Sequence, residues 1–286
     1  MTAVLRFGRL DCYASRAASL HIIPGTRPRP ASIKTWQTRS RLKSTTCSSP
    51  PLIYPEQPRS VKHNDLPSFL RYAERSGLDT GSTTFVGTFY EYTVADHLVP
   101  LGFSLRRVGG ASDRGIDLLG TWTLPIPKSA SEASPEPLRA IVQCKAGAGQ
   151  RVGPHLVREL EGAFIGAPVG WRSRVGNDGG DGEATENSNG NGNSPAVIGV
   201  LVTEKPATKG IRDALARSRW PMSYIYCAGE GHVRQLLWNQ QAEKTCGLTG
   251  FGVTLRHAVD EHAGAYTHIV LTWQGKPLPA APVEVS

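Results

Sequence analysis

Apolar residues recur along the chain in two periods, one typical of helices and one typical of strands. A spacing of three to four residues predicts four helices, at 65–77, 83–99, 153–164 and 208–219. Short apolar runs bounded by Gly, Pro or Ser predict five strands, at 103–108, 116–124, 138–145, 196–203 and 222–227. Ser82 is a good N-cap for the second helix. One face of that helix is apolar: Val86, Phe89, Tyr90, Val94, Leu98 and Leu101.

The order of these elements predicts the fold class. The first three strands follow one another without a helix between them, so we expect them to be antiparallel. Helices separate the last two strands, which are therefore expected to run parallel to a neighbour. The prediction is an α/β domain with a mixed central β-sheet flanked by helices on both faces.

The chain divides into four parts. A basic leader is followed by a Pro-rich linker with a short helix, by the α/β domain, and by a C-terminal β extension of the same domain. A polar stretch inside the domain has almost no apolar residue, so we expect it to be a disordered insert. Two further strands, at 250–257 and 266–273, would form a hairpin that extends the sheet or a small addition beside it. The bounds are 1–47, 48–82, 83–229 with the insert at 177–194, and 230–286.

The net charge of +8 belongs to the leader. The first 47 residues hold nine of the 32 Lys and Arg residues and one of the 24 Asp and Glu residues, which leaves 23 of each in the remainder. A leader rich in Arg and Ser and poor in acids is typical of a mitochondrial transit peptide, and the matrix is the expected location. The alternative is a disordered basic tail that binds RNA or nucleus-bound carriers.

Membrane-spanning, disulfide and zinc-binding classes are disfavoured. The longest apolar run, 196–202, is too short to span a bilayer, so no membrane span is predicted. The five cysteines show no spacing typical of a disulfide framework or a zinc site, which fits a reducing compartment.

Four polar residues form the candidate site. Asp117 stands near the start of the second strand, and Gln143 and Lys145 lie two residues apart on the third. A period of two places Gln143 and Lys145 on one face, with Cys144 on the other. Asp117 on the neighbouring strand would face that pair, and Glu91 on the preceding helix would reach the same cleft.

These side chains suit Mg²⁺ or Mn²⁺, which prefer oxygen ligands. Asp117 would be the anionic ligand, Gln143 would offer its carbonyl oxygen, and the main-chain oxygen of Cys144 would add another. Lys145 would orient the attacking water, lower its pKa or offset charge on a phosphate.

Each residue also has a purely structural explanation. Asp117 alone would be a turn cap, and Lys145 alone would extend to solvent; their combination on adjacent strands favours a site. Arg151 and Arg158 are candidates for contacts to nucleic-acid phosphates, with a solvated surface as the equal alternative. Glu159 and Glu161 are expected on the helix surface.

Three segments carry a resemblance to a known superfamily: "GTFYEYTVADHLVPLGF", "DRGIDLLG" and "VQCKAG". They resemble the PD-(D/E)XK, or restriction-endonuclease-like, nucleases, and in particular the Mrr-like branch, which has Gln-x-Lys in place of Glu-x-Lys. "HLVRELEGAF" and "GVLVTEKPATKGIRDALA" match the same branch, so the resemblance covers about residues 84–227. With its leader, the whole chain resembles the "required for respiratory growth protein 7" family of fungi.

The resemblance implies a restriction-endonuclease-like core and a function. Asp117 would bind the metal, Gln143 would bind or position it, Lys145 would be catalytic, and Glu91 would support the site. The expected activity is metal-dependent hydrolysis of DNA in mitochondria, in support of genome maintenance and respiratory growth, with RNA as an alternative substrate. Cleavage of two strands would favour a homodimer. The alternative function is an inactive nuclease fold that binds nucleic acid or assists assembly.

Overall fold

The computed structural model describes the body of the chain. It describes residues 52–55, 62–109, 115–125, 136–147, 149–168, 170–172, 196–260 and 264–280. The predicted transit peptide (1–47) and the predicted insert (177–194) lie outside these described residues.

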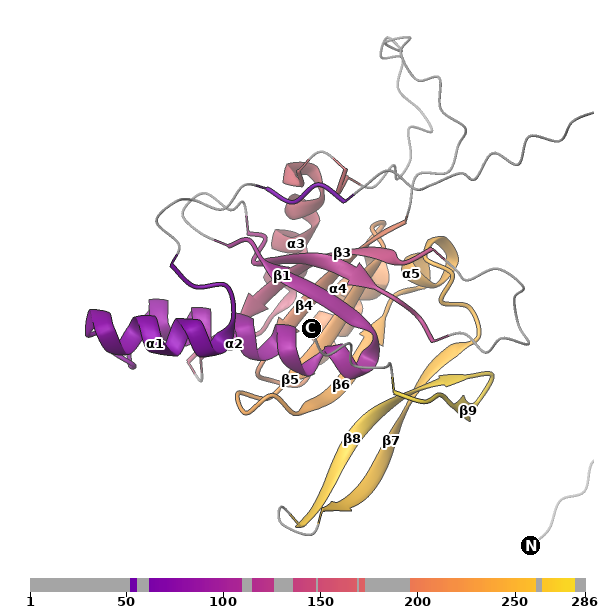
Figure 1. The fold of residues 1–286 in the computed structure, drawn as a ribbon. Coiled ribbons are helices and arrows are strands. Elements are labelled where there is room, and N and C mark those ends of the chain that lie inside the picture. The colour runs from indigo at the N-terminus through magenta and orange to yellow at the C-terminus, as the bar shows by residue number, and fades with distance from the viewer. Residues whose placement is uncertain are drawn as a thin grey trace, which may run out of the picture. The chain divides into compact units, whose positions relative to one another are not determined.

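Six strands form the main sheet, in the order in which they occur along the chain (Figure 1). The first three are antiparallel, β3 to β5 are parallel, and β6 is antiparallel to β5. All seven residues of the central strand β4 are buried, as expected for a strand covered on both faces. The strands are β1 (Phe103–Arg107), β2 (Leu118–Trp122), β3 (Leu138–Lys145), β4 (Val197–Thr203), β5 (Met222–Cys227) and β6 (Val233–Trp238).

Five α-helices and one short 3₁₀ helix are present among the described residues. They are α1 (Leu66–Ser76), α2 (Thr83–His97), η1 (Val99–Leu101), α3 (Pro154–Gly166), α4 (Lys209–Arg217) and α5 (Gln240–Thr245). The predicted cap of α2 is confirmed, because the Ser82 side chain accepts the N–H of Phe85 at 3.2 Å. Within the described chain, every helix is too short or too polar to cross a bilayer.

The helices cover both faces of the main sheet. Tyr90, Val94 and Leu98 of α2 pack on one face with alternate residues of β3 such as Val142. On the other face, α3 and α4 pack against residues that include Ile141. The predicted α/β class, with a mixed sheet flanked by helices, is therefore confirmed.

The C-terminal segment forms a second sheet rather than only extending the first. β7 (Phe251–Asp260), β8 (Gly264–Trp273) and β9 (Lys276–Pro277) pair antiparallel in that order. Ile269 and Leu271 of β8 join the core on the α2 side of the main sheet. Of the two alternatives for the predicted hairpin, the separate addition is the one observed. Strand β6 and helix α5 were not predicted.

Residues 52–55, expected within a linker, pack against the folded body. Leu52 and Tyr54 contact the core on the α3 side. The Tyr54 ring lies 5.3 Å from that of Trp171, and Trp171 Nε1 donates to the carbonyl of Ile53 at 2.8 Å. The guanidinium of Arg106 lies 4.6 Å above the Tyr54 ring, so this short stretch is held by β1 as well.

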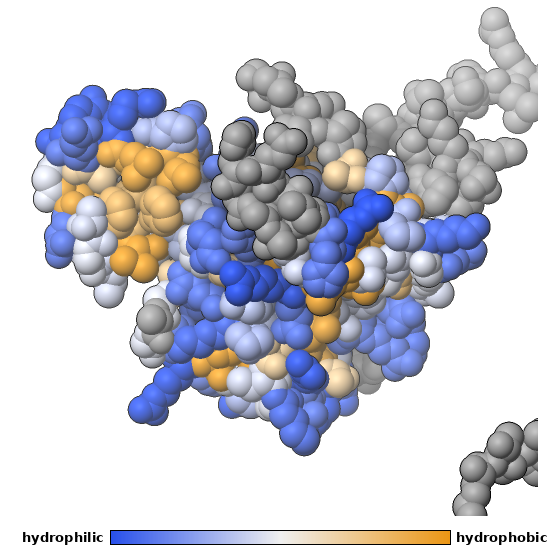
Figure 2. All heavy atoms as spheres, turned by 90° about the horizontal axis from the view of Figure 1, so that it is seen from below, coloured by the Kyte–Doolittle hydropathy of each residue, from blue (hydrophilic) through white to orange (hydrophobic). Residues whose placement is uncertain are grey.

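Helix α1 docks on α2 through aromatic side chains. Phe69 is buried and its ring lies 5.3 Å from that of Phe85. Figure 2 shows that hydrophobic residues also gather on the outer surface over α1, where Leu70 remains 42% exposed.

We expect Gly120→Ala to lower the free energy of unfolding by about 3 kcal/mol, near the upper end for overpacking. A Cβ at Gly120 would lie 1.9 Å from the backbone oxygen of Ser104 on β1, and backbone cannot rotate away. Gly87→Ala is the control, because a Cβ there meets nothing within 4 Å in the middle of α2. It should stabilise the protein by about 0.5–1 kcal/mol.

Urea unfolding of the two variants tests the register of β1 and β2. If Gly120→Ala is as stable as the unaltered chain, the pairing of Leu105 with Gly120 is wrong.

Candidate metal centre

Asp117 stands where the pairing of β2 with β3 ends. Leu118 and Val142 are the last paired residues, and Asp117 still donates its N–H to the Val142 carbonyl at 3.0 Å. Its carboxylate then takes the place of a strand partner, because Oδ2 accepts the N–H of Cys144 at 2.6 Å. This charge-assisted hydrogen bond fixes the carboxylate at the end of the ladder.

Gln143 is buried next to this point, with 4% of its surface exposed. Its Oε1 atom is buried and has no hydrogen-bond partner in the part of the chain that the structure describes. Its Nε2 atom lies close to Gly115, where an added Cβ would be 3.1 Å away. A buried carbonyl oxygen without a partner is uncommon in folded proteins and costs about 1–3 kcal/mol.

Lys145 lies on the same face of β3 as Gln143, as predicted from the period of two. Its Nζ atom lies 3.0 Å from Oε2 of Glu159 on α3, and the two side chains are 25% and 46% exposed. An ion pair this open to water contributes little to stability. Its main effect is to orient the Lys145 ammonium group.

Glu91 reaches the same end of the sheet from the opposite face. Its Oε2 atom lies 2.5 Å from Nε of Arg107 at the end of β1, and both side chains are largely buried. Arg107 also donates from Nη2 to the Thr88 hydroxyl at 3.5 Å. Glu91 thus has a charge partner within the protein, and α2 carries it on the side of the sheet away from Lys145.

Cys144 lies between the charged residues. Burial holds the pKa of the Cys144 thiol well above its usual range, and the negative charges of Asp117 and Glu91 raise that pKa further, while Lys145 lowers it. The thiol therefore stays protonated at neutral pH and is a poor metal ligand. The main-chain oxygen remains the ligand that Cys144 would offer.

The donor set fits a hard divalent cation. Asp117 offers a carboxylate oxygen, and Gln143 offers a buried amide oxygen without a partner among the described residues. Glu91, expected in the same cleft, lies on the opposite face of the sheet and is paired with Arg107. No group of three or more His, Cys, Asp or Glu side chains in the described ranges is placed to hold a metal ion. A Mg²⁺ site needs only a small number of protein ligands, because the ion keeps several of its bound waters.

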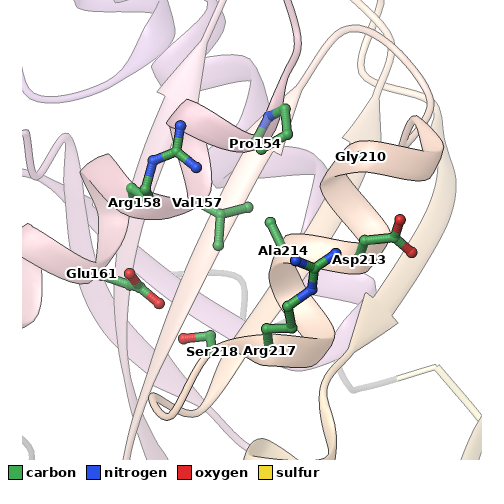
Figure 3. A pocket seen from close by; sticks show the side chains of 9 residues that line it. All are labelled: Pro154, Val157, Arg158, Glu161, Gly210, Asp213, Ala214, Arg217 and Ser218. Atoms are coloured by element: carbon green, nitrogen blue, oxygen red, sulfur yellow. The ribbon is translucent and has the colours of Figure 1, made fainter.

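The two arginines predicted to contact nucleic acid lie on the α3 side of the sheet. Arg151 is exposed in the segment before α3. Arg158 lines a groove of about 480 Å³ between α3 and α4. Figure 3 shows Arg158 and Glu161 projecting from α3, with Asp213 and Arg217 on α4. The four charges balance, so the groove has no excess of positive charge. The contacts of Arg151 and Arg158 with nucleic acid stay predictions.

Sequence reasoning missed the two ion-pair partners, Glu159 and Arg107. Glu159 lies exposed on the surface of α3 as predicted, but its pairing with Lys145 was not predicted, and Arg107 was not singled out. The only signal available was the 3.6-residue period of α3, which places Glu159 one turn after His155 but does not show which strand residue lies beneath it.

Comparisons with known proteins show a similarity to one family. Residues 82–177 match the family model described as "Required for respiratory growth protein 7". The protein of that name from Eremothecium gossypii, described as mitochondrial, is 41% identical over 133 aligned residues, with 36% of this chain and 55% of the relative covered. These matches support the fungal respiratory growth protein 7 family.

Two further relatives agree. The protein of the same name from Zygosaccharomyces rouxii is 30% identical over 140 residues, covering 37% of this chain and 58% of its own. An uncharacterized mitochondrial protein of Schizosaccharomyces pombe is 29% identical over 186 residues, covering 64% of this chain and 62% of its own. The chain thus spans somewhat more than half the length of these relatives. No solved structure matches the chain.

The names of the relatives bear on location and role. All three are described as mitochondrial, which supports a mitochondrial location for this chain. A role in respiratory growth is consistent with the names of two of them. The family match begins at Ser82, the cap of α2, and includes all of the predicted site residues.

We expect Gly115→Ala to disturb Gln143 selectively. Gly115 has φ of 76°, so alanine there costs about 1–2 kcal/mol of backbone strain, and its methyl group would also press on Gln143 Nε2. Gly275→Ala is the matched control, with φ of 79° and nothing within 4 Å of the added Cβ.

Urea unfolding and the NMR signal of the Gln143 side-chain amide measure the effect. The Gly115 variant should lose more stability than the Gly275 variant and should alone shift the amide signal. Equal losses with an unmoved signal would contradict the placement of Gln143.

Proposed function

We propose that this chain is a mitochondrial, metal-dependent nuclease-like protein that hydrolyses phosphodiester bonds in DNA. Under this proposal its main sheet and helices correspond to a restriction-endonuclease-like core of the Mrr type. The order of the elements supports this correspondence: a helix, three antiparallel strands, a helix, a strand, a helix and a strand. The same proposal places the protein in the mitochondrial matrix and links it to genome maintenance. It also includes a homodimer, in which each protomer would cleave one of the two DNA strands.

One observation carries the proposal: the Gln143 Oε1 atom is buried without a partner among the described residues, beside a carboxylate that is fixed in place. A structural role for Gln143 would satisfy both ends of its amide group. A ligand role leaves the oxygen open, with Asp117 on the neighbouring strand as the anionic partner.

The residues divide the chemistry among them. Asp117, Gln143 and the Cys144 carbonyl would hold Mg²⁺ or Mn²⁺, with Glu91 in support. The ion would supply Lewis-acid stabilisation of the phosphate and a more acidic water. Lys145 would place its ammonium group where negative charge develops on the phosphate oxygens. The weak, half-exposed pair with Glu159 lets Lys145 exchange a carboxylate for a phosphate at little cost.

A second candidate is a nuclease-like scaffold without cleavage, which binds nucleic acid or assists assembly. The observation in its favour is that Glu91 and Lys145 each have an ion-pair partner within the protein. Satisfied charges are typical of structural residues. The even balance of acidic and basic residues outside the leader favours this alternative as well.

Cleavage of labelled DNA and RNA by the full chain, with Mg²⁺ or Mn²⁺, tests the proposal. We expect DNA cleavage that needs the metal, and a loss of about 10²–10³-fold in kcat with Lys145→Ala, because that variant removes the ammonium group from the transition state. Lys209→Ala is the control, since its side chain is 91% exposed and pairs only one turn away, with Asp213.

Calorimetry with Mn²⁺ separates the two candidates. Asp117→Asn should weaken Mn²⁺ binding if Asp117 is the anionic ligand. Cleavage that is equal in the Lys145 and Lys209 variants would contradict the nuclease proposal. The scaffold would be favoured by three results together. The unaltered chain would cleave nothing, Asp117→Asn would leave the affinity for Mn²⁺ unchanged, and nucleic-acid binding would be intact.

A further inference from the structure

Three strand ends meet at one edge of the main sheet. Strands β3, β4 and β5 are parallel, so their carboxyl ends lie side by side. Lys145, the last residue of β3, is paired with Thr203, the last residue of β4. The residues directly after β4 are Glu204 and Lys205, and neither has been assigned a role so far.

Glu204 holds the turn that follows β3. Its Oε2 atom accepts the N–H of Gly147 at 2.9 Å. Its Oε1 atom lies on the other side, where a Cβ added to Gly229 after β5 would be only 3.3 Å away. The carboxylate therefore occupies the space between the chain segments that leave β3 and β5.

Lys205 holds the same turn at a second point. Its Nζ atom donates to the carbonyl of Gln150 at 2.9 Å. The backbone of Lys205 is itself fixed, because its carbonyl accepts hydrogen bonds from the buried hydroxyls of Thr203 at 2.8 Å and Tyr224 at 2.7 Å. Two consecutive residues that follow β4 thus hold the turn at its start and near its end.

The turn needs such support. Gly147 has φ of 101°, and Gly149 follows closely, so the backbone here is permissive. Within the turn itself, the N–H of Gln150 donates to the Gly147 carbonyl at 3.0 Å. The turn joins Lys145 on β3 to α3, which carries Glu159, and so its shape sets where these two side chains meet.

We propose that Glu204 and Lys205 form a clamp that positions Lys145. By holding the turn after β3, the clamp fixes the end of β3 relative to the start of α3, and with them the Lys145 ammonium group beside Glu159. They are positioning residues: neither is proposed to touch substrate or metal. Their importance for hydrolysis rests on the proposed nuclease function, whereas the clamp itself does not.

Amide hydrogen exchange in the full chain tests the clamp directly. Glu204→Ala should speed exchange of the Gly147 amide about tenfold or more, because it loses a hydrogen bond to a charged acceptor. Glu204→Gln should restore protection, since the amide oxygen can accept the same N–H. Lys205→Met keeps the aliphatic stem and removes the second contact, and should also speed exchange at Gly147.

Glu230→Ala is the matched control. Glu230 is also an acid just beyond a strand end, but it is 54% exposed and pairs with Arg234. It should leave exchange at Gly147 unchanged. If Glu204→Ala leaves Gly147 protected, or if Glu230→Ala has the same effect, the clamp is wrong.

The NMR signal of Lys145 Nζ tests the positioning. Glu204→Ala should shift this signal toward that of Glu159→Gln, whereas Glu204→Gln should leave it in place. The positioning role would be overturned if Glu204→Ala speeds exchange at Gly147 but leaves the Lys145 Nζ signal in place. Both readouts are independent of cleavage, so they decide the clamp even if the unaltered chain cleaves nothing and the nuclease proposal fails.

If the chain does cleave, kinetics adds a third criterion. Glu204→Ala should lower kcat about tenfold with little change in KM, and should add nothing in a Lys145→Ala background, because both act through the same group. Losses that multiply in the double variant would show that Glu204 acts other than through Lys145.

Discussion

The hydrogen bond from the Cys144 N–H to the Asp117 carboxylate decides the geometry of this end of the molecule. It occurs where the β2–β3 ladder ends, and it takes the place of a backbone partner. Beyond it, β3 continues to pair only with β4, up to Lys145. Gln143 therefore lies where β3 has a strand partner on one side only. It is buried, and its Oε1 atom has no hydrogen-bond partner in the described structure.

The sheet also separates two charged residues of the candidate site. It separates Glu91 on the α2 side from Lys145 on the α3 side. Both are paired, but the Glu91 pair is 13–14% exposed whereas the Lys145 pair is 25% and 46% exposed. Separating a largely buried pair leaves a poorly solvated charge, and separating a half-exposed pair does not. Lys145 is therefore the more available of the two, whereas Glu91 stays paired with Arg107.

Sequence patterns predicted the parts of the fold that apolar periodicity controls. The bounds of β3 were predicted residue for residue, and α1, α2 and β4 within one or two residues at each end, because apolar runs and capping or turn residues mark them in the local sequence. Strand β6 escaped notice because only Leu236 in it is fully buried. The common face of Gln143 and Lys145 followed from alternation. The partners Arg107 and Glu159 did not, since they depend on how helices lie across the sheet, which local spacing does not specify.

The end of β3 uses one physical device twice. Asp117 on the β2 side accepts the N–H of Cys144, and Glu204 on the β4 side accepts the N–H of Gly147. In both places a carboxylate accepts a backbone N–H at or just beyond the end of β3, and hydrogen bonds to ionised acceptors are stronger than those between neutral groups. Lys145 lies between the two bonds. A residue that leads into a glycine-containing turn is in this way held from both neighbouring strands, and the negative charge of each acid is partly satisfied by backbone.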